Sequence, residues 1–271
     1  MKASICYITC DNHPKVQQTF TALQQYTPNE HEIVILQNGN LLSQPLIRDV
    51  VLLHTSERLG IPQARNYCIQ HSTGEVIIWI DDDVEVVYGF VEAFLNPFID
   101  DANVGFVGYE TLIINENFWG QWFIDINDTN GNFDYFDSPY AISKSMLDDI
   151  GWYDEQTGPL VCDNTDLCLR AWQSGKWKLK PIQNIGLRHW HGSTTYWLIR
   201  SKIITTLIRS QWTIKVVNYM QQKHPAGWHM RYNIPYSPFI IDKRLQFPEL
   251  TGRLGGPEDK QWLKWDLFTE I

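Results

Sequence analysis

The sequence predicts an α/β fold with a mostly parallel sheet and helices on both of its faces. Two observations carry this prediction: short apolar strands alternate with helical segments along the first half of the chain, and three consecutive aspartates follow the most apolar strand. Sheets of this kind bind ligands at the carboxyl ends of their strands. Asp81, Asp82 and Asp83 are therefore expected at a ligand site.

Four strands and two helices are expected in the first half. The strands are residues 5–10, 31–36, 50–54 and 75–80. The first helix follows the polar turn after residue 10, where Val16, Phe20 and Leu23 recur at helical spacing. The second helix spans residues 61–69, with a proline in its first turn, and ends before Ser72-Thr73-Gly74. This order of strands and helices is typical of parallel sheets.

The second half of the chain is less regular. The expected elements are a strand at 104–114, a short helix at 146–150, an amphipathic helix at 163–174 ended by Gly175, and a strand or loop at 178–191. Beyond residue 193 the pattern changes to a helical stripe of Ile199, Ile203, Leu207 and Ile208. From residue 226 onward no clear period remains, so the last part of the chain is expected to be an extension of different character.

Charge and composition exclude several classes of protein. Lys and Arg number 22 against 31 Asp and Glu, and the resulting net charge of −9 argues against a nucleic-acid binder that neutralises phosphates. A hydrophobic fraction of 44% is ordinary for a folded domain and excludes a long disordered chain. The 12 Trp offer flat faces for sugar rings or bases, although a tryptophan-rich core is the more common explanation.

The cysteines indicate the compartment. Five cysteines are spread along the chain without a Cys-x-x-Cys pair, a pattern that suits free thiols in a reducing environment. The apolar stretch at the start is too short for a secretory signal, and no apolar run approaches the roughly 18 residues that would span a bilayer. We therefore expect a cytoplasmic protein, with any membrane contact made peripherally from the inner face.

The three aspartates favour a metal site. Adjacent carboxylates repel one another unless they point to solvent or share a cation, and Mg²⁺ or Mn²⁺ would take one or two of their oxygens beside phosphate and water. Capping of a helix N-terminus is a fair explanation of a single aspartate, but for three at the end of a central strand metal–phosphate binding is the stronger explanation. His189 and His191 are a weaker signal, because residues two apart on a strand point to opposite faces.

Several motifs, taken in order, resemble those of the nucleotide-sugar glycosyltransferases of family 2, which have the GT-A fold. The resemblance covers roughly the first 195 residues. It rests on the strand and turn at 32–40, Leu-Gly-x-x-x-Ala-Arg-Asn at 59–66, Gly-Glu at 74–75, Asp-x-Asp at 81–83, the Gly-Trp-Tyr-Asp-Glu run at 151–155, and the helix that carries Asp166-Leu167. The resemblance implies an inverting, metal-dependent enzyme that uses a nucleotide-diphosphate sugar in polysaccharide biosynthesis.

The resemblance also implies roles for single residues. The expected donor-binding residues are Asp11, Gln37, Asn38, Arg65, Asp81 and Asp82. The expected metal ion is Mn²⁺ or Mg²⁺, with Asp83 and either His189 or His191 as its ligands. At the acceptor, a glycan or lipid-linked glycan, it places Trp152, Tyr153 and Asp154. Gln37 stands where the family usually has an acid that contacts the nucleobase. A UDP-sugar remains the expected donor, because an amide can also hydrogen-bond the edge of a base.

The motif that carries the catalytic base can be aligned with this sequence in two ways. Counting forward from Asp154-Glu155, the Glu-Asp pair of the family's Glu-Asp-x-Asp-Leu falls on Cys162-Asp163; counting back from Asp166-Leu167, it falls on Asp163-Asn164. Because an asparagine cannot accept the acceptor's proton, Asp163 is the predicted base and Asp166 the second candidate.

Two alternatives stay open. A sugar-phosphate nucleotidyltransferase should carry a glycine-rich phosphate loop after its first strand, and residues 9–14 contain no glycine. The second alternative is a glycan-binding protein of the same fold without catalytic activity, and Asn164 is the residue that suggests it. The presence of Asp81, Asp83 and Asp163 argues against this alternative.

The expected organisation is a catalytic domain at 1–195 and an extension at 196–271 that packs on it or assists acceptor or membrane contact. The apolar stripe of the extension is accompanied by basic residues in a chain that is otherwise acidic, a combination that can draw a helix to anionic lipid. Packing against the catalytic domain is the more ordinary explanation of such a stripe. The basic residues concerned are Arg200, Lys202, Arg209 and Lys215.

Overall fold

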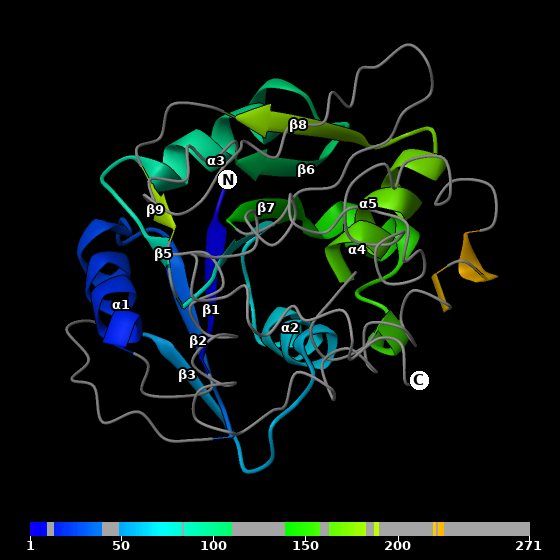
Figure 1. Cartoon of the computed structure of the whole chain (residues 1–271). Coiled ribbons are helices and arrows are strands. Elements are labelled where there is room, and N and C mark those ends of the chain that lie inside the picture. Colours follow the sequence, from blue (N-terminus) through cyan, green and yellow to red (C-terminus); the bar gives the residue numbers. More distant parts are fainter. Residues whose placement is uncertain are drawn as a thin grey trace, which may run out of the picture.

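The computed structural model describes residues 1–9, 14–39, 49–82, 84–109, 139–157, 163–182, 187–189, 219–220 and 222–224. A central seven-stranded sheet runs through the molecule (Figure 1). Its strands, in spatial order, are β3 (Val51–Thr55), β2 (Glu32–Asn38), β1 (Ala3–Thr9), β4 (Val76–Ile80), β7 (Tyr140–Ser143), β6 (Val104–Tyr109) and β8 (Lys178–Ile182). A small second sheet pairs β5 (Val84–Glu85) with β9 (Arg188–His189).

The sheet is parallel except at one strand. β3, β2, β1 and β4 run parallel to one another, and β6 and β8 are likewise parallel to each other. β7 is antiparallel to both β4 and β6, between which it lies. The predicted mostly parallel α/β sheet is therefore confirmed, with β7 as the strand that joins its two parallel parts.

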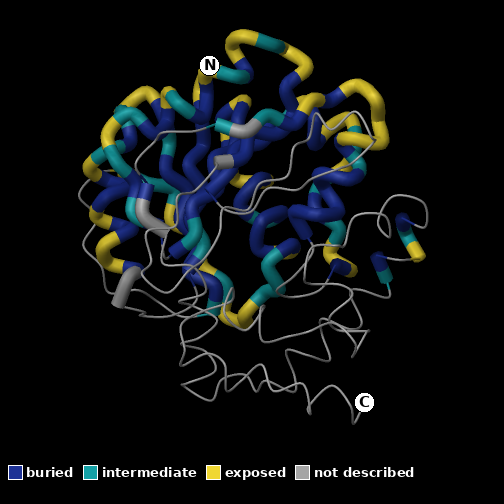
Figure 2. The backbone as a smooth tube through the Cα atoms, turned by 45° about the horizontal axis from the view of Figure 1, so that its top comes forward, coloured by how far each residue is buried: buried dark blue, intermediate teal, exposed yellow. Residues whose placement is uncertain are grey.

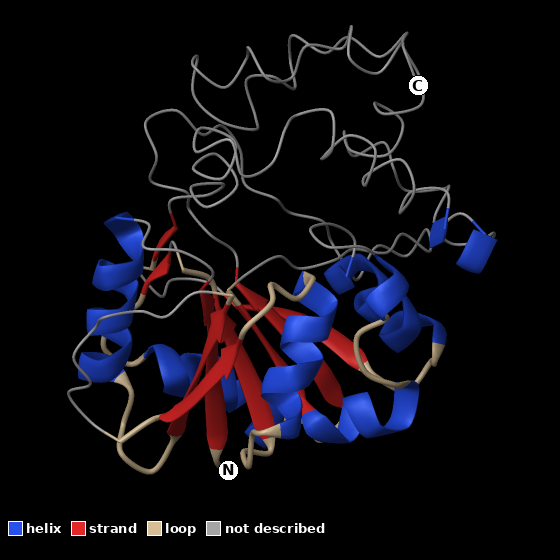
Figure 3. Ribbon diagram, turned by 90° about the horizontal axis from the view of Figure 1, so that it is seen from below, coloured by secondary structure: helices blue, strands red, loops and turns tan. Residues whose placement is uncertain are grey.

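Helices cover both faces of the sheet, as expected (Figure 3). They are α1 (Pro14–Tyr26), α2 (Ile61–Gln70), α3 (Phe90–Asp100), α4 (Lys144–Ile150) and α5 (Asp163–Gln173), with a short 3-10 helix at Glu155–Thr157. Side chains of a strand alternate between the faces, so Ile5 and Tyr7 pack with α1 and α3, whereas Cys6 packs with α2, α4 and α5. The strands form the buried interior between these two layers (Figure 2).

The predicted elements of the first half are confirmed to within one or two residues at each end, and so are the two predicted helices of the second half. The strand predicted at 104–114 is described only as far as Tyr109, and the segment predicted at 178–191 contains two strands, β8 and β9. Helix α3 and strand β7 were not predicted. Within the described residues, no helix is long and apolar enough to cross a membrane.

Glu32 ties the starts of three elements together at the amino-terminal edge of the sheet. Its carboxylate accepts hydrogen bonds from Ser4 Oγ at 2.5 Å and from the backbone N–H and hydroxyl of Thr73 at 2.5 and 2.7 Å. The following Gly74 packs so closely on β1 that a Cβ there would stand 2.5 Å from the backbone nitrogen of Ser4. The turn before β4 is thus fixed against β1.

These contacts make the stability of the fold sensitive to acid. Burial alone would raise the pKa of Glu32, but the hydrogen bonds from Ser4 and Thr73 outweigh it and lower the pKa to about 2. A lowered pKa stabilises the native state above the ordinary value of 4.5, and this stabilisation is lost as the pH falls toward 2. We expect the free energy of unfolding, measured by urea titration, to fall across that window. The Glu32→Gln variant should show a shallower fall, and an equal slope in both proteins would contradict this role.

Candidate active site

The carboxyl ends of β1, β2 and β4 meet at one edge of the sheet. Thr9 at the end of β1 pairs with Gln37, and Tyr7 pairs with Ile80, the last residue of β4. Gln37 and Asp82 are buried, and Asp81 is partly buried. The structure therefore brings Gln37, Asn38, Asp81 and Asp82, all expected on the donor side, to this edge. Asp11, also expected there, lies outside the described residues, as do Asp83 and His191.

Asn38 anchors the loop that leads into α2. Its side-chain amide donates to the carbonyl of Leu59 at 2.9 Å, and its oxygen accepts from the N–H of Leu59 at 2.7 Å and from the Thr55 hydroxyl at 3.3 Å. This reciprocal pairing fixes the start of the Leu-Gly-x-x-x-Ala-Arg-Asn segment beside β2. A donor contact by Asn38 stays a prediction.

The turn after β4 is held from two sides. The hydroxyl of Thr19 in α1 donates to the carbonyl of Asp82 at 3.2 Å, and the N–H of Val84 donates to the carbonyl of Asp81, also at 3.2 Å. Val84, the residue directly after Asp83, then pairs in the small sheet with His189. The backbone thus brings His189 next to the aspartate cluster, from a segment about 100 residues further along the chain.

Metal ligation is not visible in the described part of the chain. No group of three or more His, Cys, Asp or Glu side chains that could hold an ion occurs among the residues that the structure describes. Two of the three expected ligands, Asp83 and His191, lie outside those residues, and the third, His189, is placed only by its backbone pairing. The metal site therefore stays a prediction.

Arg65 connects α2 with the first turn of α5. The side chain is only 7% exposed, and its Nη1 forms an ion pair with Asp163 Oδ2 and donates to Asn164 Oδ1 at 2.5 Å. Its guanidinium carbon lies 5.6, 5.3 and 5.3 Å from the ring centres of Trp79, Tyr140 and Tyr153. Arg65, predicted on the donor side, thus lies in an aromatic cage beside Asp163, the predicted base.

Asn66 binds the chain segment that follows α4. Its amide donates to the carbonyl of Tyr153 at 2.9 Å and to Glu155 Oε1 at 3.1 Å, and its oxygen accepts from the N–H of Tyr153 at 3.1 Å. The hydroxyl of Tyr153 shares a 2.5 Å hydrogen bond with that of Tyr140. Tyr153, expected at the acceptor, is thereby buried between β7 and α2, where it is 3% exposed.

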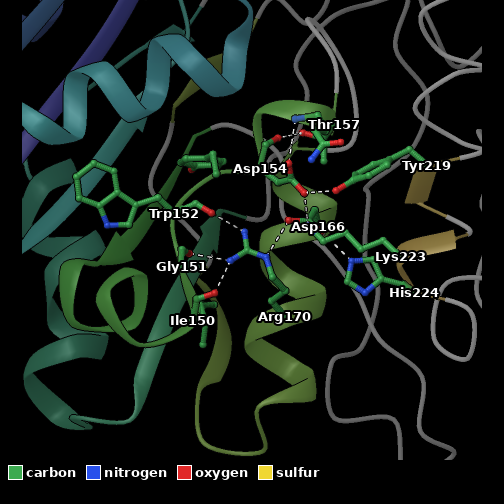
Figure 4. Close-up of polar contacts among 12 residues, drawn as sticks. Ile150, Gly151, Trp152, Asp154, Thr157, Asp166, Arg170, Tyr219, Lys223 and His224 are labelled. Carbon is green, nitrogen blue, oxygen red and sulfur yellow. Dashed lines mark hydrogen bonds and ion pairs between the residues drawn. The ribbon is translucent and has the colours of Figure 1, made fainter.

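Asp166, the second candidate base, lies at the centre of a buried network (Figure 4). Its side chain is fully buried. One oxygen accepts from Arg170 Nε at 2.8 Å, and the other is contacted at 2.8 Å by both His224 Nε2 and Lys223 Nζ. Burial would raise the pKa of Asp166, but the contacts with His224, Arg170 and Lys223 lower it to about 2. This carboxylate is ionised and enclosed by partners, which suits an anchor better than a group that must reach an acceptor hydroxyl.

The same network supports the segment of the predicted acceptor site. Arg170 donates at 2.7 Å to the carbonyls of Ile150, Gly151 and Trp152 (Figure 4). Asp154 forms an ion pair with Lys223 and accepts from the Tyr219 hydroxyl at 2.5 Å. Burial opposes ionisation of Asp154, but these contacts lower its pKa below the ordinary value. Acceptor contacts by Trp152 and Asp154 stay predictions.

Sequence reasoning missed the partners of these carboxylates. Tyr219, Lys223 and His224 lie in the extension, 57 to 69 residues from the aspartates that they contact. No local pattern signals a contact across such a separation. Arg170 could have been found, because it stands four residues after Asp166 on a helix, where opposite charges meet.

Curated proteins from other organisms share part of this sequence. A protein of Haemophilus influenzae is 26% identical in an alignment of 118 positions that covers 39% of this chain and 64% of that protein. A probable N-acetylgalactosaminyltransferase 6 of Caenorhabditis elegans is 23% identical in an alignment of 175 positions that covers 53% of this chain and 28% of that protein. The chain thus spans between about a quarter and two thirds of the length of these curated relatives.

Solved structures share the fold. A mannosyltransferase from Pyrobaculum calidifontis, solved with GDP-Man and Mn²⁺, has a TM-score of 0.52 at 15% identity and covers 80% of this chain and 64% of its own. S. aureus TarS 1–349 in complex with UDP-GlcNAc has a TM-score of 0.55 at 11% identity, over 93% of this chain and 78% of its own. These likenesses confirm the expected GT-A fold. The family model described as Glycosyl transferase family 2 matches residues 4–154, more than half of the chain, and the chain therefore belongs to that family.

Proposed function

We propose that this protein is an inverting, metal-dependent glycosyltransferase that moves a sugar from a nucleotide-diphosphate sugar to a hydroxyl of a glycan or lipid-linked glycan. The observation that carries the proposal is the meeting of Gln37, Asp81 and Asp82 at one sheet edge, in a chain of this family. Solved structures of the same fold contain GDP-Man, UDP and GalNAc, or UDP-GlcNAc. A UDP-sugar is the proposed donor, bound with Gln37 toward the base and Asp81 toward the ribose or sugar.

Asp83 and His189 are the proposed metal ligands, with His191 as the alternative to His189. Carboxylate and imidazole donors suit Mn²⁺, carboxylate suits Mg²⁺, and the pairing of Val84 with His189 supports the grouping. Two relatives of the fold were solved with Mn²⁺. When bound, the ion would neutralise the charge that develops on the leaving diphosphate.

Asp163 is the proposed general base. The carboxylate would take the proton of the acceptor hydroxyl as that oxygen attacks the anomeric carbon from the side opposite the leaving group, which inverts the configuration. Its place at the start of α5, 10% exposed, leaves it closer to solvent than Asp166, whose side chain is fully buried. Trp152 and Asp154 are proposed to lie near the acceptor, on the segment that Arg170 supports.

The extension at 196–271 is proposed to pack on the catalytic domain at 1–195. The contacts of Lys223 and His224 with Asp154 and Asp166 support this organisation. Arg200, Lys202, Arg209 and Lys215, on which peripheral contact with a membrane would depend, lie outside the described residues. A cytoplasmic location is proposed because the cysteines, three of which are buried in the structure, suit a reducing compartment. Contact with the inner face of the membrane is proposed from the basic residues of the extension.

The metal role of Asp83 can be tested by calorimetric titration with UDP in the presence of Mn²⁺. The Asp83→Ala variant is expected to lose at least about tenfold in affinity, about 1.4 kcal/mol, because a ligand of the ion that bridges protein and diphosphate is removed. Asp148→Ala, at an exposed position of α4, is the matched control and should bind like the wild type. Equal Mn²⁺-dependent affinity in folded Asp83→Ala would refute the role.

A second function is favoured by one observation. When the base motif is counted back from Asp166-Leu167, Asn164 occupies a position that is usually acidic, which would suit a glycan-binding protein that kept the fold and lost catalysis. Such a protein would bind UDP without ever cleaving a UDP-sugar, so donor hydrolysis separates the two functions.

A further inference from the structure

We propose that Arg65 is a positioning residue for Asp163: its guanidinium holds the carboxylate ionised and oriented at the start of α5, and Asn164 completes the arrangement as a neutral partner. The inference rests on the proposed function, in which Asp163 is the base. It gives Arg65 a task other than contact with the donor.

The contacts of Arg65 point to the base motif. Nη1 reaches two successive residues of the first turn of α5, with an ion pair to Asp163 and a 2.5 Å hydrogen bond to Asn164. The side chains of Arg65 and Asp163 are only 7% and 10% exposed, so water screens the pair weakly. An ion pair of this kind favours the charged carboxylate.

An aromatic cage limits the movement of the guanidinium. The rings of Trp79, Tyr140 and Tyr153 lie within 5.6 Å of its central carbon, distances at which cation–π attraction operates. Tyr153 is itself fixed by Asn66, the next residue of the helix. Because three rings hold the cation in place, they also limit the movement of the carboxylate that it binds.

A neutral residue at 164 adds no further negative charge to the ion pair of Arg65 and Asp163. Arg65 contributes one positive charge and Asp163 one negative charge, and Asn164 presents its oxygen at 5% exposure without adding another charge. An aspartate at 164 would place a second buried carboxylate on the same guanidinium, which costs free energy. Among the described residues, Asp81, Cys68, Tyr140 and Tyr153 are further titratable groups that interact with the pair.

Asn164 departs from the family's motif when the motif is counted back from Asp166-Leu167. A protein that uses the first acid of the motif as its base gains nothing from a second acid beside it, because two carboxylates sharing one cation raise each other's affinity for a proton. Asn164 instead accepts a hydrogen bond from Arg65 without adding a second carboxylate beside Asp163. The asparagine is thus compatible with catalysis and does not by itself indicate a silent protein.

The test follows the titration of Asp163 directly, by ¹³C NMR of protein labelled at the aspartate carboxyl carbons, with Asp163→Asn used to assign the signal. In Arg65→Gln the Asp163 carboxyl should titrate at a higher pH than in the wild type, whereas Arg65→Lys, which keeps the charge, should give a smaller change. In Asn164→Asp the first of the two carboxyls to take up a proton should also do so at a higher pH. Asn164→Asp is isosteric, so it gives an answer even if Arg65→Gln does not fold.

A parallel calorimetric titration with UDP and Mn²⁺ separates the two roles of Arg65. Positioning predicts affinities within about twofold of the wild type in both Arg65 variants, and turnover of a UDP-sugar lower by roughly 10²-fold in Arg65→Gln. An unchanged Asp163 titration in Arg65→Gln and Asn164→Asp would overturn the inference, as would a loss of UDP affinity without a shift of the titration. Failure of the wild-type protein to bind UDP would count against the proposed function. The NMR measurement needs no donor, so it tests the positioning role of Arg65 independently of that result.

Discussion

Asp163→Asn is expected to lower turnover of a nucleotide-diphosphate sugar by about 10²–10⁴-fold, the loss typical of removing a positioned general base. The substitution preserves shape and can still accept a hydrogen bond from Arg65, so affinity for the nucleotide should stay nearly unchanged. Initial rates and UDP affinity, measured on the same preparations, test both parts of this expectation.

Asp166→Asn serves as the comparison variant for catalysis. If a folded Asp166→Asn protein loses turnover while Asp163→Asn retains it, the base is Asp166 and the proposed assignment is wrong. If neither substitution changes a measurable turnover, no aspartate of α5 acts as the base.

Asp166→Ala is expected to lower the free energy of unfolding by about 3–5 kcal/mol, as is typical when one partner of a buried charge network is removed. The change would leave Arg170, Lys223 and His224 without the carboxylate that they share. It would also loosen the hold of Arg170 on the carbonyls of residues 150–152. Urea unfolding, followed by tryptophan fluorescence, measures the effect.

Asp148→Ala is the matched control for stability, because Asp148 is an exposed aspartate of α4. The control should unfold at nearly the wild-type urea concentration. A change below about 1 kcal/mol in Asp166→Ala would contradict the anchoring role of this residue.

Local patterns were sufficient to predict most of the fold. Strands β1, β2 and β4 are continuous apolar runs because both of their faces are covered by helices, and such runs stand out in a sequence. Helix α3 was missed although Phe90, Phe94 and Phe98 recur four residues apart, a signal that the internal Pro97 obscured. Strand β7 has only four residues, too few for a period to show.

Only those site residues that belong to short continuous sequence motifs could be predicted. The motifs placed Asp81, Asp82 and Gln37 at strand ends, and the topology of a parallel sheet then brings them to one edge. The cage around Arg65 could not be predicted, because Trp79, Tyr140 and Tyr153 come from three distant segments. The partners of Asp166 come from still further along the chain, beyond the residues that the family model matches.

The measurement that tests the central claim most directly is time-resolved ¹H NMR of the sugar that the protein releases from α-linked UDP-GlcNAc, UDP-GalNAc and GDP-mannose in the presence of Mn²⁺. An inverting glycosyltransferase that transfers to water in place of its acceptor should release the β-anomer first from at least one of these donors, and chelation of the metal should stop the release. Initial release of the α-anomer would contradict inversion, and release that persists after chelation would contradict metal dependence. UDP binding without cleavage of any of the three donors would identify the protein instead as a non-catalytic binder.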